Sequence, residues 1–162
     1  MNQRIIDDMP EIYEKVKPYI NYLESIGFTA DNDLTYFHEH NEDNYTYFNG
    51  WEYPVPGSRA DGNKEVIVDL VSFTGKPKIE IYKYSIIKTP KNYWCGNGQN
   101  KPPFILTNKR DDMKDGWESV IVDNIDDFKK EIGKFLNQIK KYNQRIKKYE
   151  LEKDFTWVNE HI

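Results

Sequence analysis

Hydrophobic residues near the C-terminal end of the chain recur at alternating spacings of three and four residues. This spacing places them along one side of a single α-helix running from Ile125 to about Lys153. At about 1.5 Å per residue the helix is about 40 Å long, which exceeds the width of a small domain. We expect its first half to pack on a β-sheet of the same chain, with self-association of its second half as the alternative. The repeat alternates isoleucine with aromatic rings: Ile125, Phe128, Ile132, Phe135, Ile139, Tyr142, Ile146 and Tyr149.

Polar residues mark the start of this helix. Asn124 suits the N-cap position, and Asp126 and Asp127 fall in the first turn, where the helix dipole favours negative charge. Apolar side chains continue beyond Lys153, and we expect this tail to fold back onto the domain.

A second apolar seam predicts an N-terminal helix over residues 9–26. Pro10 suits the first turn and Gly27 suits the position just past the end. Pro18 lies inside the helix and is expected to kink it. The apolar side is broad, which is typical of a buried helix. It consists of Ile5, Met9, Ile12, Tyr13, Val16, Tyr19, Ile20, Leu23 and Ile26.

Residues 34–53 are typical of a β-hairpin. Strands are predicted at 34–40 and 45–53, joined by a polar four-residue loop at 41–44. This loop length sets the register and places His40 opposite Tyr45. One face of the hairpin then carries mostly rings: Leu34, Tyr36, His38, His40, Tyr45, Tyr47 and Trp51.

A second hairpin is predicted from strands 65–73 and 78–87, which flank Gly75. Alternation along these strands separates an apolar core face from a mixed face. The core face is expected to hold Val66, Val68, Leu70, Ile79 and Ile81. The mixed face is expected to hold Ile67, Asp69, Val71, Glu80, Tyr82 and Tyr84.

The remaining middle of the chain adds one strand and one long connection. Residues 89–116 show no periodicity and predict an irregular loop, a length that is often functional. Residues 117–122 predict a last strand. The sequence therefore indicates one α+β domain over residues 1–162, with an antiparallel meander of about five strands within 34–122 and a helix at each end.

Composition narrows the class of protein. The 162 residues carry a net charge of −4, and the charge is unevenly distributed: residues 1–60 hold 4 basic and 11 acidic side chains, whereas residues 125–162 hold 9 and 7. This balance argues against a dedicated nucleic-acid binder. The single cysteine excludes an internal disulfide, and no apolar run has membrane-spanning length, so we expect a cytoplasmic protein that uses no membrane.

His38 and His40 are the best metal candidates. Residues two apart on a strand project to the same side and can present two imidazoles to one ion. A third ligand would have to come from Glu42, Asp43 or the distant His161. The alternative, which we favour, is a pair of hydrogen-bonded surface histidines.

Two further patterns suggest catalysis. Asp69, Glu80 and Lys83 resemble the acidic pair and lysine of metal-dependent nucleases, but residues three apart on an ideal strand point to opposite faces. Cys95 lies in a glycine-containing loop without a nearby histidine. No phosphate-binding or dinucleotide motif occurs, and we expect no cofactor.

Lysines follow neighbouring columns on one side of the C-terminal helix. A solvated face is the simplest interpretation, and docking to phosphates or to an acidic protein is the alternative. The columns contain Lys134, Lys140, Lys141, Lys147 and Lys148.

The sequence therefore favours a small non-catalytic domain that binds another protein, of the inhibitor, immunity or adaptor type, including those carried by phages and other mobile elements. A metal-dependent hydrolase or nuclease is the first alternative, and nucleic-acid binding through the lysines is the second. We expect a monomer, or a homodimer through the C-terminal helix. The predicted contact residues are Tyr45, Tyr47, Trp51, Tyr82, Tyr84, Trp94, Lys140, Lys141, Lys147 and Lys148.

Overall fold

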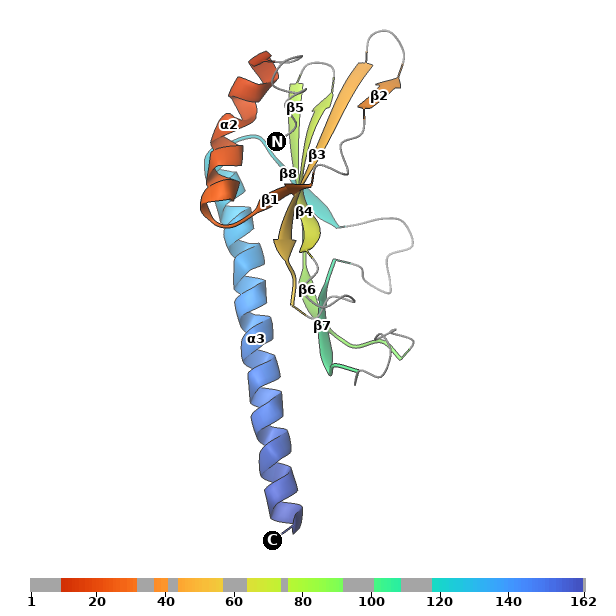
Figure 1. Ribbon diagram of the computed structural model, residues 1–162, viewed down its shortest axis with the longest axis vertical. Coiled ribbons are helices and arrows are strands. Elements are labelled where there is room, and N and C mark those ends of the chain that lie inside the picture. Colours follow the sequence, from red (N-terminus) through yellow and green to blue (C-terminus); the bar gives the residue numbers. More distant parts are fainter. Residues whose placement is uncertain are drawn as a thin grey trace.

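The protein is an α+β structure in which two helices lie on the same side of an antiparallel sheet, as the sequence predicts (Figure 1). The computed structural model describes residues 10–31, 37–40, 44–56, 64–73, 76–91, 101–108 and 118–161.

The main sheet has six strands in the order β1-β3-β4-β5-β8, with β2 pairing on β3 beside β1. A separate two-stranded sheet pairs β6 with β7. The helices are α2 (Pro10–Ser25) and α3 (Ile125–His161). The strands are β1 (Thr29–Asp31), β2 (Phe37–His40), β3 (Asn44–Pro54), β4 (Lys64–Phe73), β5 (Lys76–Tyr82), β6 (Ser85–Lys88), β7 (Phe104–Thr107) and β8 (Ser119–Val122).

Helix α2 ends where the sequence predicts. Gly27 has a φ of +96°, a conformation that glycine adopts without a steric penalty. The backbone N–H of Gly27 donates to the carbonyl of Glu24 at 3.2 Å, and that of Phe28 donates to Leu23 at 2.9 Å. These bonds satisfy carbonyls at the end of the helix and turn the chain into β1.

Helix α3 begins at the predicted cap. The side-chain oxygen of Asn124 accepts a hydrogen bond from the backbone N–H of Asp127 at 2.8 Å. The helix is embedded along its first half, where Phe128 and Ile132 are fully buried and Tyr142 is 4% exposed. The prediction that this half packs on the sheet is confirmed.

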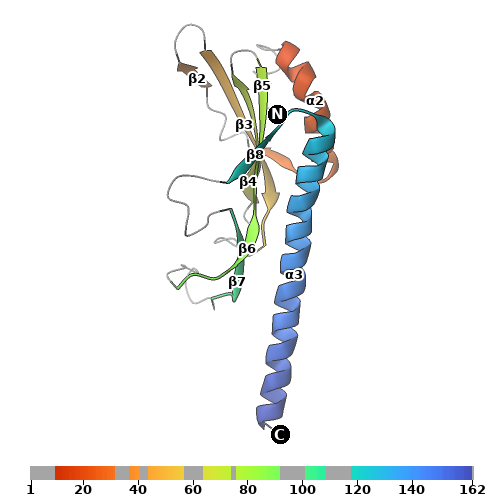
Figure 2. The ribbon, with the colours of Figure 1, turned by 180° about the vertical axis from the view of Figure 1, so that it is seen from behind.

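The end of α3 differs from the prediction. The tail beyond Lys153 was expected to fold back, but the helix continues to His161 and every residue from 147 to 156 is exposed. Both views of the ribbon show this stretch extending past β6 and β7, clear of the strands (Figure 2). The apolar side chains of the tail continue the helical spacing, and this local preference prevails over a return to the body.

The first hairpin is shifted by one residue from its expected register. His40 pairs with Asn44 and His38 pairs with Thr46, where Tyr45 and Tyr47 were expected. The connection between the strands spans residues 41–43, one residue fewer than predicted, and loop length fixes hairpin register. The predicted alignment of histidines with tyrosines is therefore wrong.

The second hairpin confirms most of its predicted faces. Val68 pairs with Ile81 and Leu70 with Ile79, and all four are buried.

Three residues are exceptions. The register between β3 and β4 shifts between Trp51 and Glu52, so Ile67 has no Cα partner in β3 and is fully buried in the core beside Val68. An extra residue of this kind interrupts strict alternation, which single-strand reasoning cannot anticipate. Val66, which was expected in the core, lies on the face of Asp69 and Gly50. Tyr84, which was expected on the mixed face, is buried against Phe135.

Several strand boundaries also differ from those predicted. The expected strand 78–87 is divided between β5 and β6, which belong to different sheets. The expected irregular loop 89–116 contains β7. Strand β1 was not predicted, because three residues carry too little periodicity to be recognised.

Aromatic rings join the helices to the sheet. The ring of Phe128 meets that of Tyr19 edge-on, with centroids 5.0 Å apart, and lies 6.1 Å from that of Tyr22. About two turns further along, the Phe135 ring lies 5.9 Å from that of Tyr53 in β3 and 5.4 Å from that of Tyr84. These contacts fasten α3 to α2, to β3 and to the segment joining β5 to β6.

Replacing Phe128 with Ala should lower the free energy of unfolding by about 3–5 kcal/mol, because it removes a fully buried ring and leaves a cavity. Urea denaturation followed by circular dichroism measures this loss. Ile121→Ala is the control, since Ile121 is 58% exposed, and it should cost less than about 1 kcal/mol. Equal losses in the two variants would contradict the proposed role of Phe128.

Candidate functional site

A groove of about 520 Å³ lies between the end of β3 and the middle of α3. We call it the Tyr53 groove. It is lined by Tyr53, Leu136, Ile139, Lys140, Asn143, Gln144 and Lys147.

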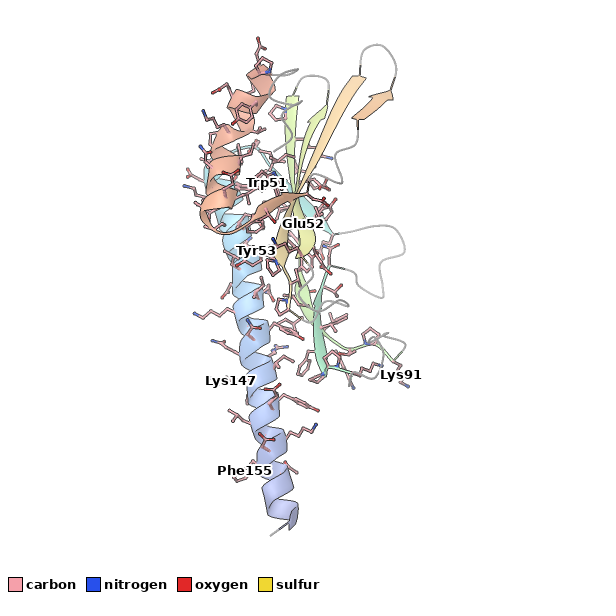
Figure 3. The ribbon with its side chains drawn as sticks, viewed as in Figure 1. Trp51, Glu52, Tyr53, Lys91, Lys147 and Phe155 are labelled. Atoms are coloured by element: carbon pink, nitrogen blue, oxygen red, sulfur yellow. The ribbon has the colours of Figure 1, made fainter. Side chains whose placement is uncertain are left out.

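The apolar part of the groove is held in place by the core. The Tyr53 ring packs at 4.6 Å from that of Phe28 and 5.9 Å from that of Phe135, which fixes its position between the sheet and α3 (Figure 3). Leu136 and Ile139 are partly buried against the same core. Their remaining exposed surface forms an apolar strip.

The polar part of the groove comes from the next column of α3. Lys140 and Lys147 are both exposed and lie two helical turns apart, with Asn143 between them. An ammonium group is a compact charge on a flexible stem that can reach over neighbouring apolar surface. The arrangement suits a ligand with carboxylates beside aliphatic or aromatic side chains.

Of the lysine columns predicted on the C-terminal helix, one lines the groove. Lys140 and Lys147 line the groove, whereas Lys141 and Lys148 do not. At 100° per residue, Lys141 and Lys148 lie about 100° further around the helix. Lys148 forms an exposed ion pair with Glu152 at 3.9 Å.

Two predicted contact residues lie in the core. Trp51 is 1% exposed and Tyr84 is 8% exposed, so neither contributes to an outer surface in this conformation. The Tyr84 hydroxyl donates to Glu65 at 2.7 Å. Burial, followed by the charge of Glu65, raises the pKa of Tyr84 far above its ordinary value.

Tyr82 belongs to a polar cluster on the sheet face turned away from the helices. Its hydroxyl donates to Oδ2 of Asp69 at 2.5 Å. Asp69 is 2% exposed, and its Oδ1 is buried without a hydrogen-bond partner. A Cβ on Gly50 would stand 3.8 Å from Oδ1, an ordinary van der Waals contact, but only 3.1 and 3.3 Å from the methyl groups of Val66.

The electrostatics of this cluster follow from burial. Burial raises the pKa of Asp69 to about 6; the hydrogen bond from Tyr82 opposes this shift, whereas the negative charge of Glu80 adds to it. Asp69 and Glu80 are Cα partners across β4 and β5, so the predicted acidic pair is brought together. Glu80 also accepts a hydrogen bond from Ser119 at 2.6 Å and lies 3.7 Å from Lys78.

Asp69, Glu80 and Lys83 do not complete the nuclease arrangement within the described residues. Lys83 follows the end of β5 at Tyr82 and so lies outside the strand. No group of three histidine, cysteine, aspartate or glutamate side chains able to hold a metal occurs in that part of the chain.

A second cavity, of about 300 Å³, lies where β5 leads into β6 beside α3. Tyr82 and Tyr84 line it together with Glu131 and Lys134. Lys134 forms an ion pair with Glu131 of the same helix, with Nζ 2.8 Å from Oε1.

The other predicted residues are placed only in part. For Tyr45, Tyr47, His38 and His40 the structure gives backbone positions in β2 and β3, and metal binding by the two histidines stays a prediction. Trp94 and Cys95, with the rest of residues 92–100, lie outside the described ranges.

No family model matches this chain, and neither a curated protein nor a solved structure matches it. Within the described ranges, no helix is both long enough and apolar enough to cross a membrane.

Sequence reasoning missed the groove residues Tyr53, Leu136 and Ile139 as a binding surface. A signal was present: Leu136, Lys140, Asn143 and Lys147 follow a four-three-four spacing parallel to the core seam. Asn108 was missed as well. It is buried, and its Nδ2 donates to the carbonyls of Lys83 at 2.5 Å and Glu118 at 2.6 Å, tying β7 to the ends of β5 and β8.

Asp69→Asn should change how stability depends on pH. Because the folded-state pKa of Asp69, about 6, is above the unfolded value near 4, the folded state favours the protonated carboxyl. The contribution of Asp69 is therefore present below about pH 4 and lost as pH rises through about 6. The variant should gain about 2 kcal/mol relative to wild type between pH 4 and pH 7.

Urea denaturation at half-unit pH intervals measures this difference. Glu14→Gln, which removes an exposed carboxylate of α2, is the control. A stability difference between Asp69→Asn and wild type that stays constant from pH 4 to pH 7 would show that Asp69 does not titrate in this range.

Proposed function

We propose that this chain is a non-catalytic, cytoplasmic protein-binding domain, and that the Tyr53 groove holds an acidic amphipathic segment of another protein. The observation that carries the proposal is the pairing of an apolar strip from Leu136 and Ile139 with the two exposed lysines of the next column.

Charge complementarity supports this choice of partner. Among the residues that line the groove, Lys140 and Lys147 are charged and no acidic side chain is present. Opposed charges steer the approach of a partner, while the apolar contacts and the rigid Tyr53 ring supply most of the binding free energy. A helix laid in the groove would place carboxylates at i and i+7 opposite the lysines.

Nucleic-acid binding is the second candidate. Five basic and no acidic side chains occur in residues 140–148, which favours an electrostatic contact with phosphates. That mode would use the charge of both lysine columns and would need no apolar strip.

Reversing the groove lysines in Lys140→Glu/Lys147→Glu should weaken partner binding at least tenfold, because attraction becomes repulsion at two positions along the edge of the apolar strip. Proteins captured by wild type but not by this variant would be identified by mass spectrometry, and the dissociation constant of the purified partner would then be measured by calorimetry. The expected partner presents an acidic segment with apolar anchors.

The matched control is Lys130→Glu/Lys141→Glu, which makes the same charge change on exposed residues of α3 that do not line the groove. It should leave the dissociation constant within about threefold of wild type. Equal loss in the two variants, with binding to duplex or single-stranded nucleic acid that falls steeply with salt, would support the second candidate instead.

A further inference from the structure

The projecting end of α3 carries an exposed apolar pair. Leu151 is 63% exposed and Phe155 is 69% exposed, more than any other large hydrophobic residue in the described parts of the chain. They lie one turn apart and therefore share a face. At 100° per residue, Leu151 and Phe155 point about 140° and 180° away from Phe128, and about 100° and 140° away from Ile132, the two seam residues that face the sheet.

The helix that carries this pair has little support from the body. From Lys147 to His161 it would extend about 22 Å at 1.5 Å per residue. An isolated helix of this length is marginal in water, since most helical stability comes from packing an apolar face. Figure 3 places Phe155 on this stretch, beyond the strands.

Charge is segregated along the same helix. Residues 140–148 contain five basic and no acidic side chains, whereas residues 149–161 contain four acidic side chains and one lysine. If α3 of a second copy ran in the same direction, the basic block of one helix would lie against the basic block of the other, and the acidic block against the acidic block. A copy running in the opposite direction would place each basic block against an acidic block.

The charged residues flank the apolar pair in a way that fits the antiparallel arrangement. Lys147 and Asp154 are seven residues apart on one flank, and Lys148 and Glu152 are one turn apart on the other. Around a twofold axis perpendicular to two antiparallel helices, each flank lies against the same flank of its partner. Both pairs are centred near residue 150, so one axis satisfies both flanks.

We propose that α3 pairs with α3 of a second copy of this chain, antiparallel, with Leu151 beside the twofold axis and Phe155 about 7 Å along the helix from it. Lys147 then faces Asp154 of the second copy and Lys148 faces its Glu152, each pair occurring twice because the contact is isologous. The contact is small, so it forms a reversible dimer whose population rises with protein concentration. The inference does not depend on the partner of the Tyr53 groove.

Sedimentation equilibrium of the purified full chain tests the contact. Wild type should show a monomer–dimer equilibrium, and Leu151→Ser/Phe155→Ser should raise the dimer dissociation constant at least tenfold. Both replaced side chains are exposed, so circular dichroism should confirm an unchanged fold. The control Ile121→Ser removes an apolar side chain of similar exposure from β8 and should leave the dissociation constant unchanged. A monomeric wild type at all concentrations would overturn the proposal.

Charge reversal tests the direction of pairing. Lys147→Glu/Lys148→Glu and Glu152→Lys/Asp154→Lys should each weaken self-association, because each places like charges together. An equimolar mixture of the two variants should restore a dimer, since the reversed block of one chain then meets the reversed block of the other. No recovery on mixing would overturn the antiparallel arrangement.

The second variant also separates this proposal from the proposed function. Glu152 and Asp154 do not line the Tyr53 groove, so their reversal should weaken self-association while leaving the binding of a groove partner intact. The binding of a groove partner by Lys140→Glu/Lys147→Glu tests the proposed function. The self-association of Glu152→Lys/Asp154→Lys tests the proposed dimer.

Discussion

The structure depends on the burial of one side of α3. Phe128, Ile132 and Phe135 are each at most 3% exposed, and their contacts reach α2, β3 and the segment joining β5 to β6. No single β-strand pair could hold these elements together, because hydrogen bonds between strands act only within a sheet. The ring contacts act between layers, and they determine where the helix stands relative to the main sheet.

The same burial determines which surfaces of α3 remain available. A helix has about 3.6 residues per turn, so fixing one column against the core fixes the direction of every other column. Ile139 and Leu136 lie at the margin of the buried side and form the apolar strip of the groove, and Lys140 and Lys147 follow at its edge. Beyond Ile146 the helix has no neighbouring strands to pack against, and every side chain from residue 147 to residue 156 is exposed.

Elements with strong hydrophobic periodicity can be predicted from the sequence. The prediction fails where a single residue changes the register between strands. The N-terminal helix, the cap at Asn124 and the buried pairs of β4 and β5 follow from spacing alone. The hairpin register depended on a loop one residue shorter than expected, and the burial of Ile67 depended on an extra residue opposite β3. The groove joins Tyr53 to residues more than 80 positions away, and only tertiary packing places them together.

Asp69 illustrates why a polar group on a strand cannot be assigned a role from sequence. Alternation placed it correctly on the mixed face, but its burial follows from its neighbours: Gly50 is its Cα partner on β3, and Tyr82 satisfies Oδ2. A larger residue than glycine at position 50 would meet the methyl groups of Val66 at 3.1 and 3.3 Å. The carboxyl is therefore enclosed by close packing on one side and hydrogen-bonded on the other, and desolvation, more than the nearby charge of Glu80, raises its pKa.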